Sequence, residues 1–279
     1  MPAKIIDGKA IAQSITDRAA QRRDQLGFTP GLAAILVGDD PASRLYVGLK
    51  EKACARVGIH FEKILLPADI SETAILAEIA ELNGRNDIDA ILVQLPLPQP
   101  LNEDRIIAAL DPAKDVDGFH PDNVDALLRG RPRLIPGLAA GIMELIGSTG
   151  IALAGKTAVT VANSQVFYQP LAKVLTDAGA KTIFAGPNEV GRDGATGLAD
   201  VLIVAVGRPR LITGAMIKPG AVVIDVGTNR VGDKVVGDVE RTSTETTAGH
   251  LTPVPGGVGP VTVAMLLSNT VALAAARRG

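Results

Sequence analysis

Short apolar segments alternate with helix-like segments along the whole chain, and this alternation constrains the fold more than any other feature. In the first half the apolar segments are GLAAILVGDD (31–40), FEKILLP (61–67) and DAILVQLPLP (89–98). In the second half they are GKTAVTVAN (155–163), AKTIFAG (180–186), ADVLIVAVG (199–207) and GAVVIDVG (220–227). Short continuous apolar runs between helices are typical of buried parallel strands joined by right-handed crossovers. The sequence therefore predicts an α/β fold, with a Rossmann-like parallel sheet in its second half.

The helix-like segments have recognisable ends. Pro41 and Gly58 delimit a helix after the first strand, and Ser71 and Gly84 delimit a helix after the second. The stretch LAKVLTDAG lies between the first two strands of the second half, and the C-terminal VTVAMLLSNTVALAAARRG is expected to form one long helix.

Composition restricts the class of protein. The chain has 279 residues, a length typical of two domains, and its 28 basic and 30 acidic residues give a net charge of −2. Because there is no basic excess and no polybasic block, we expect neither nucleic acid nor a membrane as a partner. The single cysteine, Cys54, excludes an intramolecular disulfide, the N-terminus lacks the apolar core of a signal peptide, and no uninterrupted apolar run reaches about 18 residues. These features predict a cytoplasmic protein.

Three side chains of the first predicted helix share one face. Ser43, Tyr46 and Lys50 are spaced i, i+3 and i+7, and the helix begins just after a strand, where open α/β sheets bind ligands. A Lys beside a Tyr ring and partly desolvated can act as a general acid or base. The alternative is a solvated surface Lys next to an ordinary core Tyr.

Gln94 ends the third strand. Its side-chain amide could hold a Lys ammonium there, or it could cap a loop.

A cluster of carboxylates occupies the segment DPAKDVDGFHPDN (111–123). Such a cluster suits a metal, a cationic partner or a ring amidine that donates two N–H groups to one carboxylate, although Asp is also common in turns. The spacing lacks the Gly and terminal Glu of a calcium loop. His60, His120 and His250 are isolated, so the sequence predicts no metal site.

Several of these stretches together resemble one family. SRLYVGLKEKACARVGI, VQLPLP, KDVDGFHPDNV, IKPGAVVIDVGTNRV and TPVPGGVGPVTVAMLLSNT are similar to the motifs of bifunctional methylenetetrahydrofolate dehydrogenase/cyclohydrolases, and they occur in family order. The resemblance implies a homodimer with a folate cleft between two domains. Residues 1–140 and 260–279 would form the folate-binding catalytic domain, with the C-terminal helix returning to it, and residues 141–259 the Rossmann-like domain.

The resemblance also implies two reactions and a set of site residues. NADP-linked oxidation would convert 5,10-methylenetetrahydrofolate to 5,10-methenyltetrahydrofolate, and hydrolysis would then give 10-formyltetrahydrofolate. The matching catalytic residues are Lys50, Gln94 and Tyr46. Tetrahydrofolate derivatives would bind at Asp117, which matches the pterin-binding Asp, and at Ser43, Pro255, Gly256 and Gly257. The cofactor would contact Ser164, Asn163, Gly207 and Thr228.

The cofactor-facing stretches depart from the family pattern. VANSQVFYQP (161–170) has Ala162 and Tyr168 where the family has glycines, and Asn163 where the family has the Arg that meets the 2′-phosphate. Tyr168 would put a ring in the path of the cofactor. The stretches 136–141 and 185–187 have changed as well, whereas AVGRPR (205–210) survives.

This selective pattern leaves three functions open. General decay would strike both halves alike, so we expect a folate enzyme with a remodelled nucleotide site that uses NADP, NAD or no cofactor. The alternatives are a cyclohydrolase whose dehydrogenase activity is lost and a non-catalytic folate-binding relative. The intact pair of Lys50 and Gln94 argues against the last of these, because binding alone needs no proton shuttle.

Overall fold

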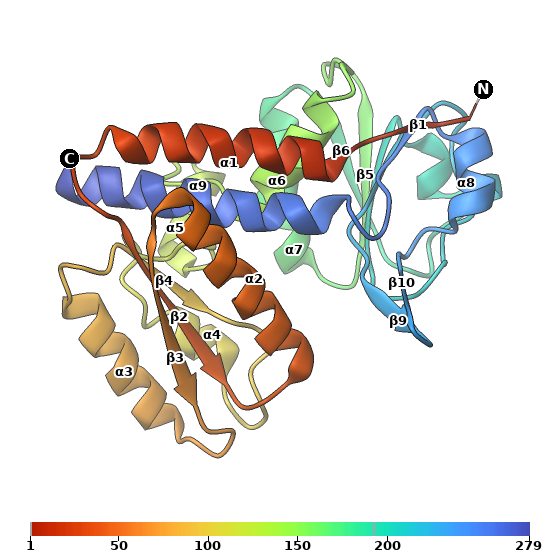
Figure 1. Ribbon diagram of the computed structural model, residues 1–279. Helices are drawn as coiled ribbons and strands as arrows, with labels where there is room; N and C mark the ends of the chain where they lie inside the picture. Colours follow the sequence, from red (N-terminus) through yellow and green to blue (C-terminus); the bar gives the residue numbers. More distant parts are fainter. Residues whose placement is uncertain (1, 192) are drawn as a thin grey trace. The chain divides into compact units, whose positions relative to one another are not determined.

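The computed structural model describes residues 2–191 and 193–279, which form two compact units (Figure 1). One unit contains the N-terminal segment through Ala12 together with Leu138–Thr262, and the other contains Gln13–Gly137 together with Val263–Gly279. The two-domain α/β fold is therefore confirmed, including the return of the C-terminal segment to the first domain.

The unit of residues 13–137 and 263–279 contains a three-stranded parallel sheet. Its strands are β2 (Gly31–Val37), β3 (His60–Leu66) and β4 (Ala90–Val93), in the order β3-β2-β4. Its helices are α2 (Pro41–Val57), α3 (Glu72–Gly84), α4 (Glu103–Ile107), α5 (Pro121–Leu128) and parts of α1 (Gly8–Asp24) and α9 (Val258–Arg278).

Both faces of this sheet are covered, which explains why its strands are continuous apolar runs. Leu32 and Ala34 of β2 pack with residues of α2 and α9, whereas Ala33 and Ile35 pack on the opposite face with residues of α3. All seven residues of β2 are buried. The sheet therefore forms a fixed platform whose carboxyl end carries the start of α2 and Gln94.

The unit of residues 1–12 and 138–262 contains a six-stranded parallel sheet. Its order is β1-β11-β8-β7-β5-β6, with strands β1 (Lys4–Ile5), β5 (Thr157–Ala162), β6 (Lys181–Ala185), β7 (Val201–Ala205), β8 (Val222–Asp225) and β11 (His250–Leu251). The remaining elements are α6 (Gly137–Gly147), α7 (Gln165–Asp177), α8 (Arg241–Thr247), the 3₁₀ turns Ala195–Leu198 and Gly214–Met216, and the hairpin of β9 (Asn229–Val231) and β10 (Lys234–Val236).

The strand order has a topological switch point between β5 and β7. The chain runs outward from β5 to β6 in one direction and from β7 to β8 in the other. The crevice at the carboxyl ends of such strands is where doubly wound sheets bind nucleotides. The Rossmann-like prediction for this half is therefore confirmed at the level of topology.

The N-terminal segment lies in a different unit from the one that we predicted. Residues 1–12 were expected with the folate-binding domain, but Lys4 and Ile5 pair with His250 and Leu251 as the edge of the six-stranded sheet. A two-residue strand carries too little apolar pattern to be recognised in the sequence.

Helix α9 is a core helix. It begins at Val258, earlier than expected, because Pro260 falls in the first helical turn, where its missing N–H is not needed. By length and composition it could cross a membrane, but 56% of its most apolar window is buried within the protein. Leu266, Leu267 and Val271 belong to the core beside β2, which accounts for the apolar composition.

Candidate functional site

The predicted catalytic pair is assembled at the carboxyl end of the three-stranded sheet. Lys50 Nζ donates a hydrogen bond to Gln94 Oε1 at 2.9 Å, and Gln94 Nε2 donates to the carbonyl oxygen of Leu95 at 2.7 Å. The second bond fixes which amide atom faces the lysine. Gln94 directly follows β4 and its backbone N–H bonds to Ile35 of β2, so the sheet holds the acceptor while α2 supplies the amine.

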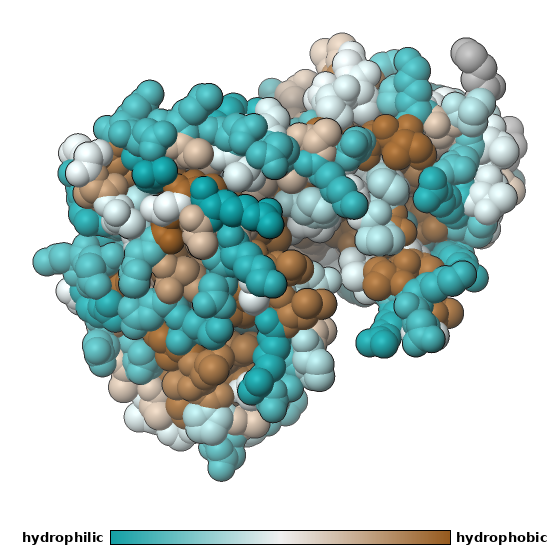
Figure 2. All heavy atoms as spheres, viewed as in Figure 1, coloured by the Kyte–Doolittle hydropathy of each residue, from teal (hydrophilic) through white to brown (hydrophobic). Residues whose placement is uncertain are grey.

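The start of α2 is locally well determined. Asp40 caps the helix by accepting a hydrogen bond from the backbone N–H of Ser43 at 2.7 Å, and Gly58 ends the helix with a φ of 75°. Tyr46 lies one turn before Lys50 and is 41% exposed, beside the exposed Leu45 and Leu49. Hydrophobic surface is visible in Figure 2 on the face of this unit where α2 lies in Figure 1. The buried Ser43 serves the helix cap, and its role toward a ligand stays a prediction.

Lys50 and Asp117 perturb one another. Burial lowers the pKa of the Lys50 amine, and the charge of Asp117 opposes this effect. Burial raises the pKa of the Asp117 carboxyl to about 6, Lys50 pulls it down, and Asp115 pushes it up. The lowered pKa of the amine increases its neutral fraction near pH 7, which a general base requires.

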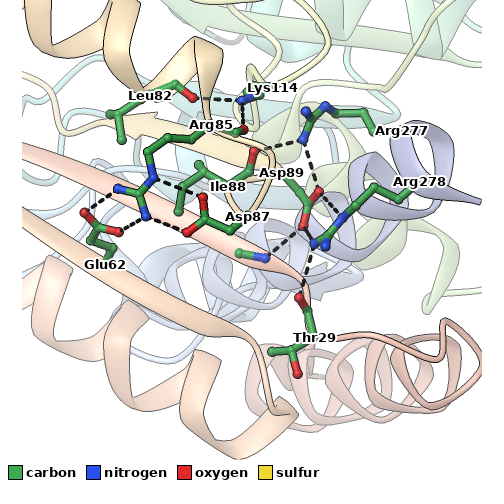
Figure 3. Close-up of polar contacts among 11 residues, drawn as sticks. Thr29, Glu62, Leu82, Arg85, Asp87, Ile88, Asp89, Lys114, Arg277 and Arg278 are labelled. Atoms are coloured by element: carbon green, nitrogen blue, oxygen red, sulfur yellow. Dashed lines mark hydrogen bonds and ion pairs between the residues drawn. The ribbon is translucent and has the colours of Figure 1, made fainter.

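The loop that carries Asp117 is fixed by its two neighbours. Lys114 is fully buried, and its Nζ donates to the carbonyl oxygens of Leu82, Asn83 and Arg85 at the end of α3, two of which Figure 3 shows. Asp115 accepts hydrogen bonds from the backbone N–H groups of Gly118 and His120 and from the side chain of Asn123. Within residues 2–191 and 193–279, no group donates a hydrogen bond to the Asp117 carboxylate. The loop is thus held by other side chains, and Asp117 is left free for a ligand.

Sequence reasoning missed the positioning roles of Lys114 and Asp115. In the cluster of carboxylates in 111–123, Asp111 and Asp115 accept backbone N–H groups. Within the ranges that the structure describes, Asp117 and the exposed Asp122 accept none, and spacing treats all four alike. His120 is also structural, because its Nδ1 accepts the N–H of Asp122 at the start of α5. Among the described residues, no group of three or more His, Cys, Asp or Glu side chains could hold a metal.

The predicted cofactor residues lie in the other unit, around the switch point. Asn163 directly follows β5, and its Nδ2 donates to the carbonyl oxygen of Val206, directly after β7, at 2.9 Å. Ser164 is exposed and precedes α7, but its side chain makes no capping hydrogen bond. Gly207 has a φ of 66°, and the N–H groups of Val206 and Gly207 are held by the buried Asp238. Thr228 is exposed after β8.

Tyr168 packs against the sheet. Its ring lies 5.4 Å from the ring of Phe184 in β6, with an interplanar angle of 54°. The contact has a geometry that stabilises aromatic pairs. A bulky residue at this position therefore has a packing partner within the domain. The expected position of this ring in the path of a cofactor stays a prediction.

The loop of Pro255, Gly256 and Gly257 also belongs to this unit. Gly256 has a φ of 104°, which a side chain would disfavour. A Cβ on Gly257 would lie 2.6 Å from the carbonyl oxygen of Pro253, so the loop itself requires this glycine. The substrate-binding roles of Pro255, Gly256 and Gly257 stay predictions.

Comparison with known families gives two matches that together span most of the chain. Residues 6–117 match the catalytic domain of tetrahydrofolate dehydrogenase/cyclohydrolase, and residues 136–278 match the NAD(P)-binding domain of the same family. The sequence is 49% identical over 275 residues to the bifunctional protein FolD of Bordetella avium, covering 97% of each chain. It is 46% identical to that of Dechloromonas aromatica over the full length of both.

Solved structures agree with these matches. The bifunctional enzyme FolD from Campylobacter jejuni, a methylenetetrahydrofolate dehydrogenase/cyclohydrolase, superposes with a TM-score of 0.94 at 40% identity over 99% of both chains. The Trypanosoma brucei enzyme, complexed with NADP cofactor and inhibitor, gives a TM-score of 0.91 at 34% identity over 98% of both chains. The protein therefore belongs to the tetrahydrofolate dehydrogenase/cyclohydrolase family, because it matches the catalytic domain and, after it along the chain, the NAD(P)-binding domain.

Proposed function

We propose that this protein is a bifunctional enzyme of one-carbon folate metabolism. It oxidises 5,10-methylenetetrahydrofolate with a nicotinamide cofactor and hydrolyses 5,10-methenyltetrahydrofolate to 10-formyltetrahydrofolate. The observation that carries this proposal is the hydrogen bond between Lys50 and Gln94 next to the unpaired Asp117. Family membership supports both activities, and relatives with nearly half of their residues identical are named bifunctional.

The hydrolysis follows from the chemistry of the amine. The methenyl carbon is an electrophilic, amidinium-like centre, and water that attacks it must lose a proton. Neutral Lys50 accepts this proton and then gives it to the ring nitrogen that departs when the ring opens. The hydroxyl proton of the intermediate is released to solvent as the formyl carbonyl forms. Gln94 Oε1 accepts a hydrogen bond from Lys50 Nζ and so fixes the position of the nitrogen. Both the neutral amine and the ammonium can donate this hydrogen bond. Tyr46, exposed one turn away, borders the pterin with its ring.

Asp117 supplies recognition of the pterin. Its carboxylate has no hydrogen-bond donor among the described residues, so both oxygens are available to the 2-amino-pyrimidinone edge of the ligand. Two parallel N–H···O bonds to a carboxylate are stronger and more directional than neutral ones. Ser43, Pro255, Gly256 and Gly257 complete the proposed folate-binding residues.

The nucleotide site retains features that suit a dinucleotide. The switch point between β5 and β7 and the exposed start of α7 at Ser164 leave backbone groups accessible for a phosphate or ribose, and Gly207, whose N–H is held by Asp238, adds no side chain at this edge. A bound nicotinamide would accept a hydride from the methylene carbon. We propose that Ser164, Asn163, Gly207 and Thr228 hold this cofactor, which is NADP in the structure of the Trypanosoma brucei relative.

A second candidate, a cyclohydrolase without dehydrogenase activity, is favoured by the loss of both family glycines at Ala162 and Tyr168. The test is to give the purified protein methylenetetrahydrofolate with NADP or NAD, and separately methenyltetrahydrofolate, and to follow absorbance. Turnover of both substrates supports the bifunctional proposal. Hydrolysis without oxidation selects the second candidate, and turnover of neither would leave a non-catalytic folate-binding protein.

Folate affinity should weaken as the pH falls through about 6. Protonation of Asp117 replaces one acceptor oxygen by an O–H, so affinity should fall by up to about tenfold per pH unit below the pKa. The same raised pKa means that the folded state holds this proton more tightly than the unfolded chain. The stability contributed by Asp117 therefore falls as the pH rises from about 4 to about 6.

The measurement is a calorimetric titration with a folate analogue between pH 5 and 7.5. Asp117→Ala should bind weakly, and Asp117→Asn, which cannot ionise, should also bind weakly but without the pH dependence. An unchanged affinity in Asp117→Ala, or the same pH profile in Asp117→Asn, would remove Asp117 from pterin binding.

The assembly and location of the protein also stay proposals. We propose a cytoplasmic homodimer, and light scattering of the purified protein tests the oligomeric state.

A further inference from the structure

We infer that the nucleotide site of this protein prefers NAD to NADP, and that Glu189 is the residue that determines this preference. The inference rests on the proposed dehydrogenase function and goes beyond it, because it assigns the cofactor and a residue that recognises it. Glu189 would accept a hydrogen bond from the 2′-hydroxyl of the adenosine ribose and would repel a 2′-phosphate.

The position of Glu189 in the fold is the first argument. It lies in the loop directly after β6, the strand next to β5 on the side of the switch point away from β7. In dinucleotide-binding sheets the second strand of the unit ends beside the adenosine ribose, and an acidic residue there hydrogen-bonds the ribose hydroxyls of NAD.

The conformation of the side chain is the second argument. Glu189 Oε2 accepts a hydrogen bond from the backbone N–H of Gly186 at 2.5 Å, and the N–H of Glu189 bonds to the carbonyl oxygen of Gly186 at 3.0 Å. The carboxylate is thus folded back onto the carboxyl end of β6. Within the described part of the chain, Oε1 makes no hydrogen bond. The exposed oxygen is therefore available to a ribose hydroxyl.

The charges around this loop are the third argument. A 2′-phosphate placed beside Glu189 would meet a like charge, and the family Arg that would neutralise it is replaced by Asn163. The Asn163 amide is already used to bridge to Val206 at the switch point. Among the described residues, the cation that reaches the loop after β6 is Arg208, whose Nη1 lies 3.4 Å from Asn188 Oδ1. Arg192 lies outside the described residues.

The alternative role for Glu189 is purely structural, since its bonds to Gly186 close a turn. The two roles make different predictions. A turn-closing residue would affect both cofactors equally when it is replaced, whereas a residue that recognises the ribose shifts the ratio of the two affinities.

The test is to measure the dissociation constants of NAD and NADP by calorimetry for the purified protein and its variants. In the wild type we expect NAD to bind at least about tenfold more tightly. Glu189→Gln should weaken NAD and strengthen NADP, and Glu189→Gln combined with Asn163→Arg should reverse the preference. Glu189→Asp, which keeps the charge, should retain a preference for NAD.

The matched control is Glu81→Gln, which removes the same charge from α3 in the other unit and should leave both affinities unchanged. Thermal melting verifies that each variant is folded. Tighter binding of NADP by the wild type, or an equal change for both cofactors in Glu189→Gln, would overturn the inference even if the protein oxidises methylenetetrahydrofolate. If neither cofactor binds, the inference and the proposed oxidation both fail, while hydrolysis stands as a separate result.

Discussion

Lys50→Met is expected to lower the rate of methenyltetrahydrofolate hydrolysis by about 10²–10⁴-fold, the typical contribution of a positioned acid or base. Methionine fills a similar volume but can neither accept nor donate a proton. Its thioether also leaves Gln94 Oε1 without the N–H donor that it has at 2.9 Å. Because Asp117 and Tyr46 are unchanged, binding of a folate analogue should persist, so the loss should fall on kcat rather than on affinity.

Two further variants separate proton transfer from charge. Lys50→Arg retains a cation, but a guanidinium does not deprotonate in proteins, so hydrolysis should also collapse. Lys52→Met removes a lysine from the same helix at an exposed position, and its rate should match that of the wild type. Hydrolysis that survives in Lys50→Met at more than a tenth of the normal rate would exclude Lys50 as the proton shuttle.

The position of Lys50 and Gln94 at one edge of the sheet could be predicted from two local signals. The spacing of Ser43, Tyr46 and Lys50 requires one helix face, and Gln94 ends an apolar strand. Since β2 and β4 are parallel neighbours, the start of α2 and the residue after β4 meet at one edge of the sheet. Local pattern and sheet topology place both residues at this edge, but they left a solvated Lys50 and a loop-capping Gln94 open. The resemblance to the family selected the catalytic pair.

The state of Asp117 could not be predicted in this way. Its availability depends on Asp115 taking the backbone N–H groups of the loop and on Lys114 reaching three carbonyl oxygens at and just after the end of α3. The contacts of Lys114 join segments about 30 positions apart in sequence, and no local signal reports them. The contacts of Asp115 are local, but spacing does not tell which carboxylate of the segment makes them. The replacement of the family Arg by Asn163 was visible in the sequence, but its hydrogen bond to Val206 across the switch point was not.

The largest effect on stability is expected at Asp89, which joins the C-terminal end of α9 to the sheet within one unit (Figure 3). Asp89 is fully buried. Its Oδ1 accepts hydrogen bonds from Arg277 Nη1 at 3.1 Å and Arg278 Nε at 2.8 Å, and its Oδ2 accepts from the backbone N–H of Gly31 at 2.9 Å and from Arg278 Nη2. Arg278 also lies 4.0 Å from the centroid of the Phe28 ring. One carboxylate therefore satisfies two guanidinium groups and the first residue of β2.

Asp89→Ala should destabilise the protein by about 3–5 kcal/mol, the usual cost of removing one partner from a buried ion pair. The N–H of Gly31 would lose its acceptor, and the two Arg side chains would face a buried position without a counter-charge. For a chain of this size the loss corresponds to a fall in the melting midpoint of about 6–20 °C, measured by scanning calorimetry or circular dichroism.

The neighbouring Asp87 provides a matched control, because it is the same residue type in the same loop but exposed. It pairs with Arg85, whose N–H groups also reach Glu62, so solvent and a second carboxylate remain when Asp87 is lost. Asp87→Ala should change the midpoint little, as is usual for exposed pairs.

Replacing Arg277 and Arg278 together by Met leaves the buried charge of Asp89 without a partner and should also destabilise the protein. A further change to Asp89→Leu in that background removes the last buried charge and should recover part of the loss. If Asp89→Ala melts at the wild-type temperature, or if the recovery is absent, then α9 is held by its apolar contacts with β2 alone.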